Sequence, residues 1–443
     1  MKIAFIVQRY GTEIIGGSEY HCRLVAEHLS EKHEVEVITT CAKNYITWEN
    51  EYPEGTDRIQ GVTVRRFTNS QTRDIDSFNK YSDWIFSNPH TDHDEEEWLK
   101  QQGPWCPALI NYLEQKHASY DALIFFTYLY APTVLGLSVA PKRSILVPTA
   151  HDEPAIRLNI YKSVFSKPAA MAYNTTVERG FLKNNFSIIP KREEIVGCGV
   201  ELSTENHLNL EKIDRAFLEK DDEDSASSMK SNPMRGSAFR RRHRLYAPIV
   251  LYGGRIDPGK GCEELIEYFN AYVNQKGDAT LALMGLKLMP IPETPFIKFA
   301  GMLSETERLE ALEAADVVVV PSPHESLSLL ALEAFSVGTP ILASARSDVL
   351  TDHCQRSNAG LYYSDCDEFV ECLNLLIKDR KLSLSMGING QNYVKNNYSW
   401  QVVLAKYERL IGGVAKKRNN RSSRSGRYQR RSNRSQTRTK QQP

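Results

Sequence analysis

The sequence predicts an α/β protein made of two Rossmann-like, doubly wound domains that face each other across a cleft. Short β-branched runs alternate with helical patterns over residues 1–201, and the alternation resumes over residues 248–390. The intervening residues 202–247 include a stretch of low hydrophobicity and are expected to form a mobile linker. At 443 residues the chain suits two cores rather than one. Because such domains bind ligands at the carboxyl ends of their strands, we expect a site in the cleft.

The N-terminal domain is expected to open with a strand, since its first apolar run is too short for the core of a signal peptide. A helix is predicted over residues 18–31, where Leu24, Val25 and Leu29 recur at helical spacing. The strands predicted for this domain are 3–7, 34–39, 62–67, 122–126, 144–148 and 169–173.

Residues 69–118 interrupt this alternation. They are polar and aromatic and contain an acidic run at 92–97. We expect an insertion here. It either lies near the cleft, where such insertions often shape acceptor binding, or covers the sheet as a helical excursion.

The C-terminal domain repeats the pattern of strands and helices. A long amphipathic helix is then predicted within 391–415, from the spacing of Trp400, Val403, Tyr407 and Leu410. The predicted strands are 249–253, 280–284, 297–299, 317–320 and 340–343, and the predicted helices are 262–273, 305–314 and 328–336.

The net charge of zero hides an asymmetry between the body of the chain and its tail. Residues 416–440 carry 11 Lys and Arg and no acid, which leaves 44 basic and 55 acidic residues elsewhere. We expect residues 416–443 to be disordered. Eight scattered cysteines without a Cys-x-x-Cys pair favour free thiols and a cytoplasmic protein. The basic tail would allow weak contact with polyanions or peripheral attachment to the inner face of a membrane.

Two glutamates eight positions apart are the most informative feature of the sequence. Val317–Val320 reads as a buried parallel strand, and Glu325 follows it in a loop that runs into the apolar helix carrying Glu333. A rise of ~1.5 Å per helical residue separates the two carboxylates by roughly 12 Å. The helix N-terminus between them offers free N–H groups to an anion. This pattern suits a ligand with hydroxyls at both ends and a charged middle, such as a nucleotide sugar.

Two glycine-containing loops could hold the charged part of such a ligand. Gly16 and Gly17 open the first helix, where adjacent glycines permit positive φ and close backbone approach to a phosphate. Arg255 and Lys260 flank a Pro-Gly turn directly after the strand at 249–253. Two cations aimed at one point would stabilise the charge of a diphosphate. The alternative for each loop is an ordinary surface turn.

His151 stands at the end of a predicted strand and is followed by Asp152 and Glu153. These residue types bind metal ions, but no second histidine is spaced to complete a site. We therefore expect no metal and no cofactor. The alternative role for His151 is a hydrogen-bonded histidine at a strand end.

Together the stretches 324–333, 253–261 and 16–19 resemble the motifs of the family 4 (group 1) glycosyltransferases, which are retaining enzymes of the GT-B fold. The resemblance implies that Glu325 contacts the transferred sugar and Glu333 the ribose. It also implies that a C-terminal helix crosses back onto the N-terminal domain. It further implies that Arg255 and Lys260 hold the donor diphosphate. Gly16 and Gly17 would form the phosphate-facing loop, and His151 would lie beside the transferred sugar.

The backbone of Ser326, Leu327, Ser328 and Leu329 is expected to face the donor as well. Many members of the family have glycine after the first glutamate, where this chain has Ser326. A side chain there narrows the space beside the phosphate or sugar, but the N–H groups of the loop can still donate.

The resemblance implies transfer of a hexose-type sugar from a nucleoside diphosphate sugar to an acceptor hydroxyl. The acceptor could be a lipid-linked saccharide, a polysaccharide or a small molecule, so glycan, polysaccharide or glycolipid biosynthesis is expected. Two alternatives stay open. One is a catalytically silent nucleotide-sugar-binding protein, and the other is a polyanion-binding protein that acts through its basic tail.

Overall fold

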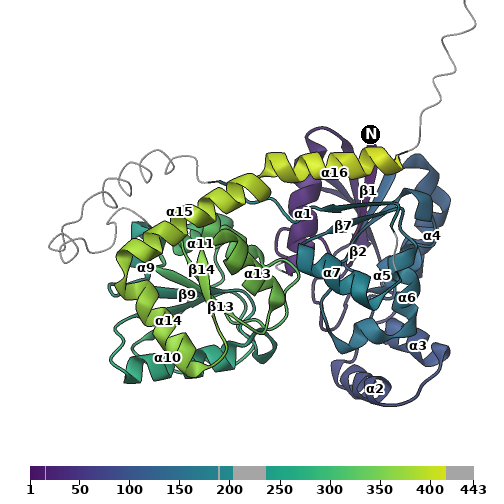
Figure 1. The fold of residues 1–443 in the computed structure, drawn as a ribbon. Coiled ribbons are helices and arrows are strands. Elements are labelled where there is room, and N and C mark those ends of the chain that lie inside the picture. The colour runs from purple at the N-terminus through teal and green to yellow at the C-terminus, as the bar shows by residue number, and fades with distance from the viewer. Residues whose placement is uncertain (15, 188–189, 203–235, 416–443) are drawn as a thin grey trace, which may run out of the picture.

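Two largely parallel sheets organise the protein, one in each half of the chain (Figure 1). The computed structural model describes residues 1–14, 16–187, 190–202 and 236–415. The predicted disordered tail and most of the predicted linker lie outside these residues. The strand order is β3-β4-β2-β1-β5-β6-β7-β8 in the N-terminal sheet and β11-β10-β9-β12-β13-β14 in the C-terminal sheet.

Each sheet reverses its winding once, between β1 and β5 in the first sheet and between β9 and β12 in the second. Such reversals open a crevice at the carboxyl ends of the strands, which is where α/β proteins bind ligands. The N-terminal strands are β1 (Lys2–Ile6), β2 (Glu34–Thr40), β3 (Gly55–Ile59), β4 (Val62–Phe67), β5 (Ala122–Phe126), β6 (Ser144–Val147), β7 (Ala170–Tyr173) and β8 (Arg192–Ile195). The C-terminal strands are β9 (Ile249–Gly253), β10 (Thr280–Met284), β11 (Ile297–Gly301), β12 (Val317–Val320), β13 (Ile341–Ser344) and β14 (Gly360–Tyr363).

Every predicted strand is present, with ends that differ by at most two residues. The prediction missed β3, β8 and β14. All three lie at the edges of their sheets. Edge strands bury less apolar surface than central ones, and β3 and β8 have polar sequences, so neither shows the apolar run that marks the interior strands.

The predicted insertion at 69–118 forms three helices of the N-terminal lobe. Leu109 and Leu113 of the third helix belong to the same buried cluster as Ile6 of β1, so this helix covers one face of the sheet. The other two helices form a hairpin at the foot of the lobe in Figure 1. The helices of this lobe are α1 (Gly17–Ser30), α2 (Ile75–Ser87), α3 (Asp92–Gln102), α4 (Pro107–Lys116), α5 (Ala131–Gly136), α6 (Asn159–Ser166) and α7 (Thr176–Asn185).

The predicted linker is too long at its C-terminal end, because residues 237–243 form helix α9 (Ser237–His243). Phe239 is fully buried in the core of the C-terminal lobe, and Arg240 pairs with Asp316 at 2.9 Å. The sequence analysis did not predict this helix, because one large apolar side chain beside a run of arginines does not form a helical pattern. The remaining helices of this lobe are α10 (Cys262–Asn274), α11 (Glu305–Ala314), α12 (Leu329–Ser336), α13 (Asp348–Ser357) and α14 (Cys366–Lys378).

The C-terminal end of the described chain forms two helices, α15 (Arg380–Asn397) and α16 (Trp400–Val414), where one long helix was predicted. The break lies at Tyr398 and Ser399. At this point Val200 donates its N–H to the Tyr398 carbonyl at 3.0 Å and forms an isolated parallel β-bridge with Ser399. The first helix lies along the C-terminal lobe and the second crosses the N-terminal lobe (Figure 1).

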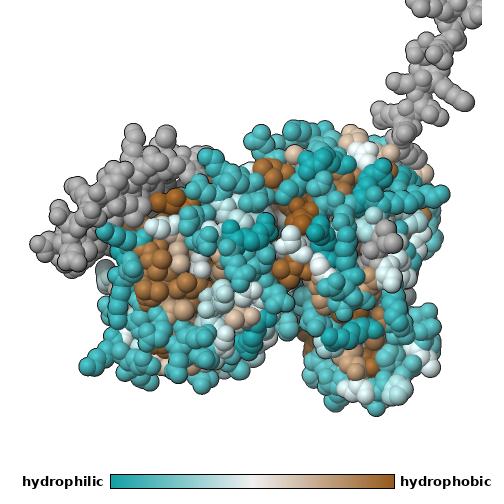
Figure 2. Space-filling view, in the orientation of Figure 1, coloured by the Kyte–Doolittle hydropathy of each residue, from teal (hydrophilic) through white to brown (hydrophobic). Residues whose placement is uncertain are grey.

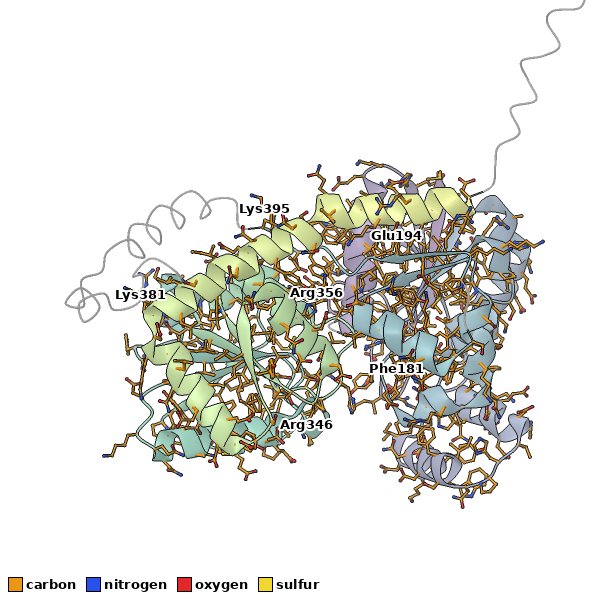
Figure 3. All side chains as sticks on the ribbon, viewed as in Figure 1. Phe181, Glu194, Arg346, Arg356, Lys381 and Lys395 are labelled. Carbon is orange, nitrogen blue, oxygen red and sulfur yellow. The ribbon has the colours of Figure 1, made fainter. Side chains whose placement is uncertain are left out.

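Helix α16 is anchored on the N-terminal lobe by apolar and charged contacts. Tyr407 and Leu410 are buried in one cluster with Phe5 of β1. Arg409 pairs with Glu194 of β8 at 2.9 Å, and Glu194 lies beside this helix in Figure 3. The last described helix is therefore part of the N-terminal core.

In the part of the chain that the structure describes, no helix combines the length and the apolar character needed to cross a bilayer.

Candidate functional site

A cleft of about 860 Å³ between the lobes brings most of the predicted site residues together. Gly16, Gly17 and His151 line it from the N-terminal lobe, and Arg255, Lys260 and the segment 325–329 line it from the C-terminal lobe. In Figure 2 the lobes are separated by a notch at the lower edge of the view. None of the described residues that line the cleft comes from 69–118.

A second hollow of about 360 Å³ adjoins the cleft and shares Arg255, Lys260 and Glu325 with it. Glu333 lines this smaller hollow but not the larger one. The two predicted glutamates therefore face different parts of one connected site.

The loop after β9 is shaped to present Lys260 to the cleft. The Asp257 carboxylate accepts the Lys260 N–H at 2.9 Å and caps a short 3₁₀ turn. Gly261 follows with φ of +75°, and a Cβ there would lie 2.5 Å from the Pro321 carbonyl oxygen at the end of β12. The glycine lets this loop pack directly against the loop that carries Glu325.

The two cations of this loop have different partners. Lys260 Nζ lies 2.8 Å from Glu325 Oε1, so it bridges two of the predicted donor-binding elements. Arg255 donates through Nη1 to the Tyr45 hydroxyl of the opposite lobe at 2.9 Å. It also lies 3.4 Å from the Asp257 carboxylate. Tyr45 was not predicted, since it stands in a loop without a motif.

The loop from Glu325 to Leu329 contains an unusual backbone conformation. Ser328 is buried and lies in the left-handed region, with φ of 62° and ψ of 80°. Helix α12 begins at Leu329, one residue later than predicted, because Ser328 is not helical. A non-glycine residue held in this region is costly and tends to occur at functional sites.

The side chain of His353 in α13 anchors this loop. The sequence analysis did not predict this histidine as part of the site. Its Nε2 lies 2.8 Å from the Leu327 carbonyl and its Nδ1 lies 3.0 Å from the Tyr393 hydroxyl. Burial lowers the pKa of His353, which favours a neutral ring. Such a ring donates from Nε2 to the carbonyl and accepts from the tyrosine, which fixes the loop at Leu327.

Glu333 is buried and pairs with Arg308 of α11 at 2.8 Å. Burial raises the pKa of Glu333 while Arg308 opposes that rise. Arg308 also donates to the Tyr20 hydroxyl of α1 at 2.7 Å, so it joins the predicted ribose-binding carboxylate to the opposite lobe. The sequence predicted the carboxylate but neither of these partners.

The glycine pair after β1 does not use the positive φ that glycine permits. Gly16 has φ of −63°, and neither glycine lies in the left-handed region. Close packing explains why position 16 is a glycine. A Cβ there would lie 2.2 Å from the Glu19 carboxylate, which pairs with Arg9 at 2.6 Å. At Gly17 a Cβ would meet no described atom within 4 Å, so the N-terminus of α1 is open towards the cleft.

His151 stands in the cleft beside charged and aromatic neighbours. Its Nε2 lies 3.7 Å from Glu153 Oε2, and its ring stacks on that of His324 from the opposite lobe with centroids 5.5 Å apart. Burial lowers its pKa, Glu153 opposes this and His324 adds to it. The imidazole is therefore suited to hydrogen bonding as a neutral ring at neutral pH.

A buried carboxylate beneath His151 ties two cleft loops together. Glu178 of α7 accepts the Ala150 N–H at 2.7 Å and the Asn174 N–H at 2.6 Å. The sequence analysis did not predict this side chain. The Asn-Thr-x-x-Glu spacing of residues 174–178 is the signal that could have identified the helix start and its carboxylate.

Comparisons with known proteins identify relatives of this chain. Residues 247–379 match the family described as glycosyl transferases group 1. A D-inositol 3-phosphate glycosyltransferase of Corynebacterium glutamicum is 23% identical over 359 residues, which cover 74% of this chain and 80% of that protein. A GDP-mannose-dependent monoacylated alpha-(1-6)-phosphatidylinositol monomannoside mannosyltransferase of the same species is 25% identical over 170 residues, which cover 35% of this chain and 45% of the relative.

Solved structures share the arrangement of both lobes. A sucrose-phosphate synthase from Thermosynechococcus elongatus superposes with a TM-score of 0.64 at 18% identity, covering 93% of this chain and 98% of that one. Anabaena HepE in complex with UDP superposes with a TM-score of 0.62 at 15% identity, covering 93% and 100%. The predicted fold is confirmed, and the match over residues 247–379 together with these relatives supports the predicted resemblance to the family 4 (group 1) glycosyltransferases, which have the GT-B fold.

Proposed function

We propose that this glycosyltransferase moves a hexose-type sugar from a nucleoside diphosphate sugar to an acceptor hydroxyl with retention of the anomeric configuration. The observation that carries the proposal is the convergence of Arg255, Lys260 and Glu325 with Gly17 and His151 in one cleft between the lobes. Two cations from one loop and the open N-terminus of α1 suit a diphosphate. The adjoining carboxylates suit the hydroxyls of a sugar and of a ribose.

The leaving diphosphate gains charge as the glycosidic bond breaks. Lys260 and Arg255 would stabilise that charge in a partly enclosed site, where a fixed donor contributes on the order of 10²–10³ in rate. Arg255 is held across the cleft by Tyr45, so its position depends on both lobes. Closure of the lobes would complete the site and exclude water.

Glu325 and His151 would orient the transferred sugar, and Glu333 would bind the ribose. The retaining outcome is proposed to follow a front-face path, in which the departing diphosphate oxygen receives the proton of the acceptor hydroxyl. Catalysis then depends on orientation and charge stabilisation by the chain itself. No metal is part of this proposal.

The relatives support a nucleotide-sugar donor without naming its base or sugar for this chain. One relative is described as GDP-mannose-dependent, and one structural neighbour was solved with UDP. We propose a lipid-linked saccharide, a polysaccharide or a small molecule as acceptor, in glycan, polysaccharide or glycolipid biosynthesis.

The proposal is tested by replacing Lys260 with alanine. Turnover of the preferred donor, chosen from UDP-, GDP- and ADP-hexoses, is expected to fall by about 10²–10³ because the leaving-group charge loses a fixed cation. The exposed Lys298 of β11 offers a matched control, and Lys298→Ala should retain wild-type turnover. Equal turnover by wild type and Lys260→Ala would sink the proposal.

Two further readouts separate the parts of the proposal. Proton NMR of the product should show the anomeric configuration of the donor, and inversion would contradict the retaining path. Turnover should change less than about twofold after treatment with a chelator. A loss that Mg²⁺ or Mn²⁺ restores would overturn the metal-independent part.

We also propose that the basic segment 416–440, outside the described residues, contacts anionic membranes weakly. Its 11 cations would bind such surfaces with strong salt dependence. A chain truncated after Ala415 should no longer sediment with vesicles containing phosphatidylserine at low salt. Sedimentation equal to that of the full chain would contradict this part.

A further inference from the structure

Asn174, at the carboxyl end of β7, is a buried polar residue that no step above uses. Its side chain is 1% exposed, yet the residue lines the cleft. Its amide oxygen, Oδ1, is buried and has no hydrogen-bond partner among the described residues. We propose that Asn174 Oδ1 accepts a hydrogen bond from one hydroxyl of the transferred sugar, an inference that rests on the proposed function.

The orientation of the amide follows from its neighbours. Asn174 Nδ2 donates to Glu178 Oε1 at 3.5 Å. With the nitrogen on this side, Oδ1 is the end of the amide that has no partner among the described residues. The Asn174 N–H also donates to Glu178 Oε2 at 2.6 Å, so backbone and side chain are held by one carboxylate.

The donor-facing loop of the C-terminal lobe meets Asn174 at this point. Ser326 Oγ lies 3.5 Å from Asn174 Nδ2, and Thr175 donates its hydroxyl to the Ser326 carbonyl at 3.4 Å. Ser326 is adjacent to Glu325, the residue expected to contact the transferred sugar. Asn174 and Glu325 therefore line the same cleft from opposite lobes.

A buried acceptor without a partner is unfavourable, and a ligand hydroxyl would relieve that cost. A sugar presents several hydroxyls at fixed angles, whereas a diphosphate presents only acceptors and cannot pair with Oδ1. The unpaired oxygen therefore selects the sugar over the diphosphate as its partner.

The experiment compares sugar recognition in wild type and Asn174→Ala. Wild type is first titrated with UDP-, GDP- and ADP-linked glucose and mannose and with the free nucleoside diphosphates. The accepted donor is then replaced by its 2-, 3-, 4- and 6-deoxy analogues. For each protein we measure the ratio of the dissociation constant of the deoxy donor to that of the parent donor. This ratio does not depend on the fraction of folded protein.

Wild type should bind one deoxy analogue about tenfold more weakly than the parent. In Asn174→Ala that ratio should fall to about one, while the ratios at the other positions persist. Asn69 provides a matched control, because it is 6% exposed, has an unpaired Oδ1 and does not line the cleft. Asn69→Ala should discriminate among the analogues as wild type does.

The outcomes separate the two proposals. If wild type binds none of the nucleotide sugars, both the proposed function and this inference fail. If wild type discriminates among the deoxy donors and Asn174→Ala discriminates equally at every position, only the inference fails. Loss of discrimination in Asn69→Ala as well would also overturn it, since the effect would then be structural.

Discussion

At the scale of single residues, Glu178 is the group whose protonation the fold controls most clearly. Burial raises its pKa to about 8, and the N–H groups of Asn174 and Ala150 limit that rise. The ordinary pKa of a glutamate is 4.5. The folded protein therefore binds a proton that the unfolded chain has lost between these values, and stability should fall as pH rises from about 4.5 to about 8.

Replacing Glu178 with glutamine tests this assignment. The variant cannot titrate at this position, so its free energy of unfolding should rise relative to wild type as pH increases across the window. Urea unfolding at several pH values between 4 and 9 measures the difference. A difference that stays constant with pH would show that Glu178 keeps an ordinary pKa in the folded protein.

At the scale of elements, α16 links the end of the described chain to the N-terminal core. Leu410 is 2% exposed and packs in the cluster that contains Phe5 and Val37. Leu410→Ala should lower the free energy of unfolding by about 2–5 kcal/mol because a buried cavity remains.

Leu404 on the same helix is only partly buried and serves as the control. Leu404→Ala should cost clearly less in urea unfolding. Equal costs for the two variants would mean that α16 is not packed as part of the core.

At the scale of the whole molecule, polar pairs across the cleft connect the two lobes. Arg308 donates to the Tyr20 hydroxyl at 2.7 Å, and Arg23 pairs with Glu305 at 2.5 Å. Tyr20→Phe removes one of these bonds and leaves the Arg308–Glu333 pair in place. We expect the affinity for a nucleoside diphosphate to fall by about three- to tenfold, the size of one hydrogen bond.

Titration calorimetry with the preferred nucleoside diphosphate measures this effect. Tyr246 is 86% exposed, so Tyr246→Phe is the matched control and should bind as wild type does. Unchanged affinity in Tyr20→Phe would mean that the cross-lobe bond does not contribute to the bound arrangement.

The interior strands of both sheets and the local motifs of the site could be predicted from the amino-acid sequence. Two of these strands, Val317–Val320 and Ile249–Gly253, are continuous apolar runs, which is the composition expected of a strand buried on both faces. Both were predicted with the bounds that the structure shows. Arg255, Lys260 and Glu325 were likewise predicted, since each stands in a short segment whose spacing carries the pattern. Edge strands and α9 were missed, because their stability comes from neighbours rather than from their own periodicity.

The side-chain contacts across the cleft could not be predicted in this way. Arg308 with Glu333, Tyr45 with Arg255, and Asn174 with Ser326 lie far apart in the chain and share no local signal. The break between α15 and α16 has the same origin, because it coincides with the bridge between Ser399 and the distant Val200. Contacts of this kind arise from how two separately patterned lobes dock, and local periodicity contains no information about docking.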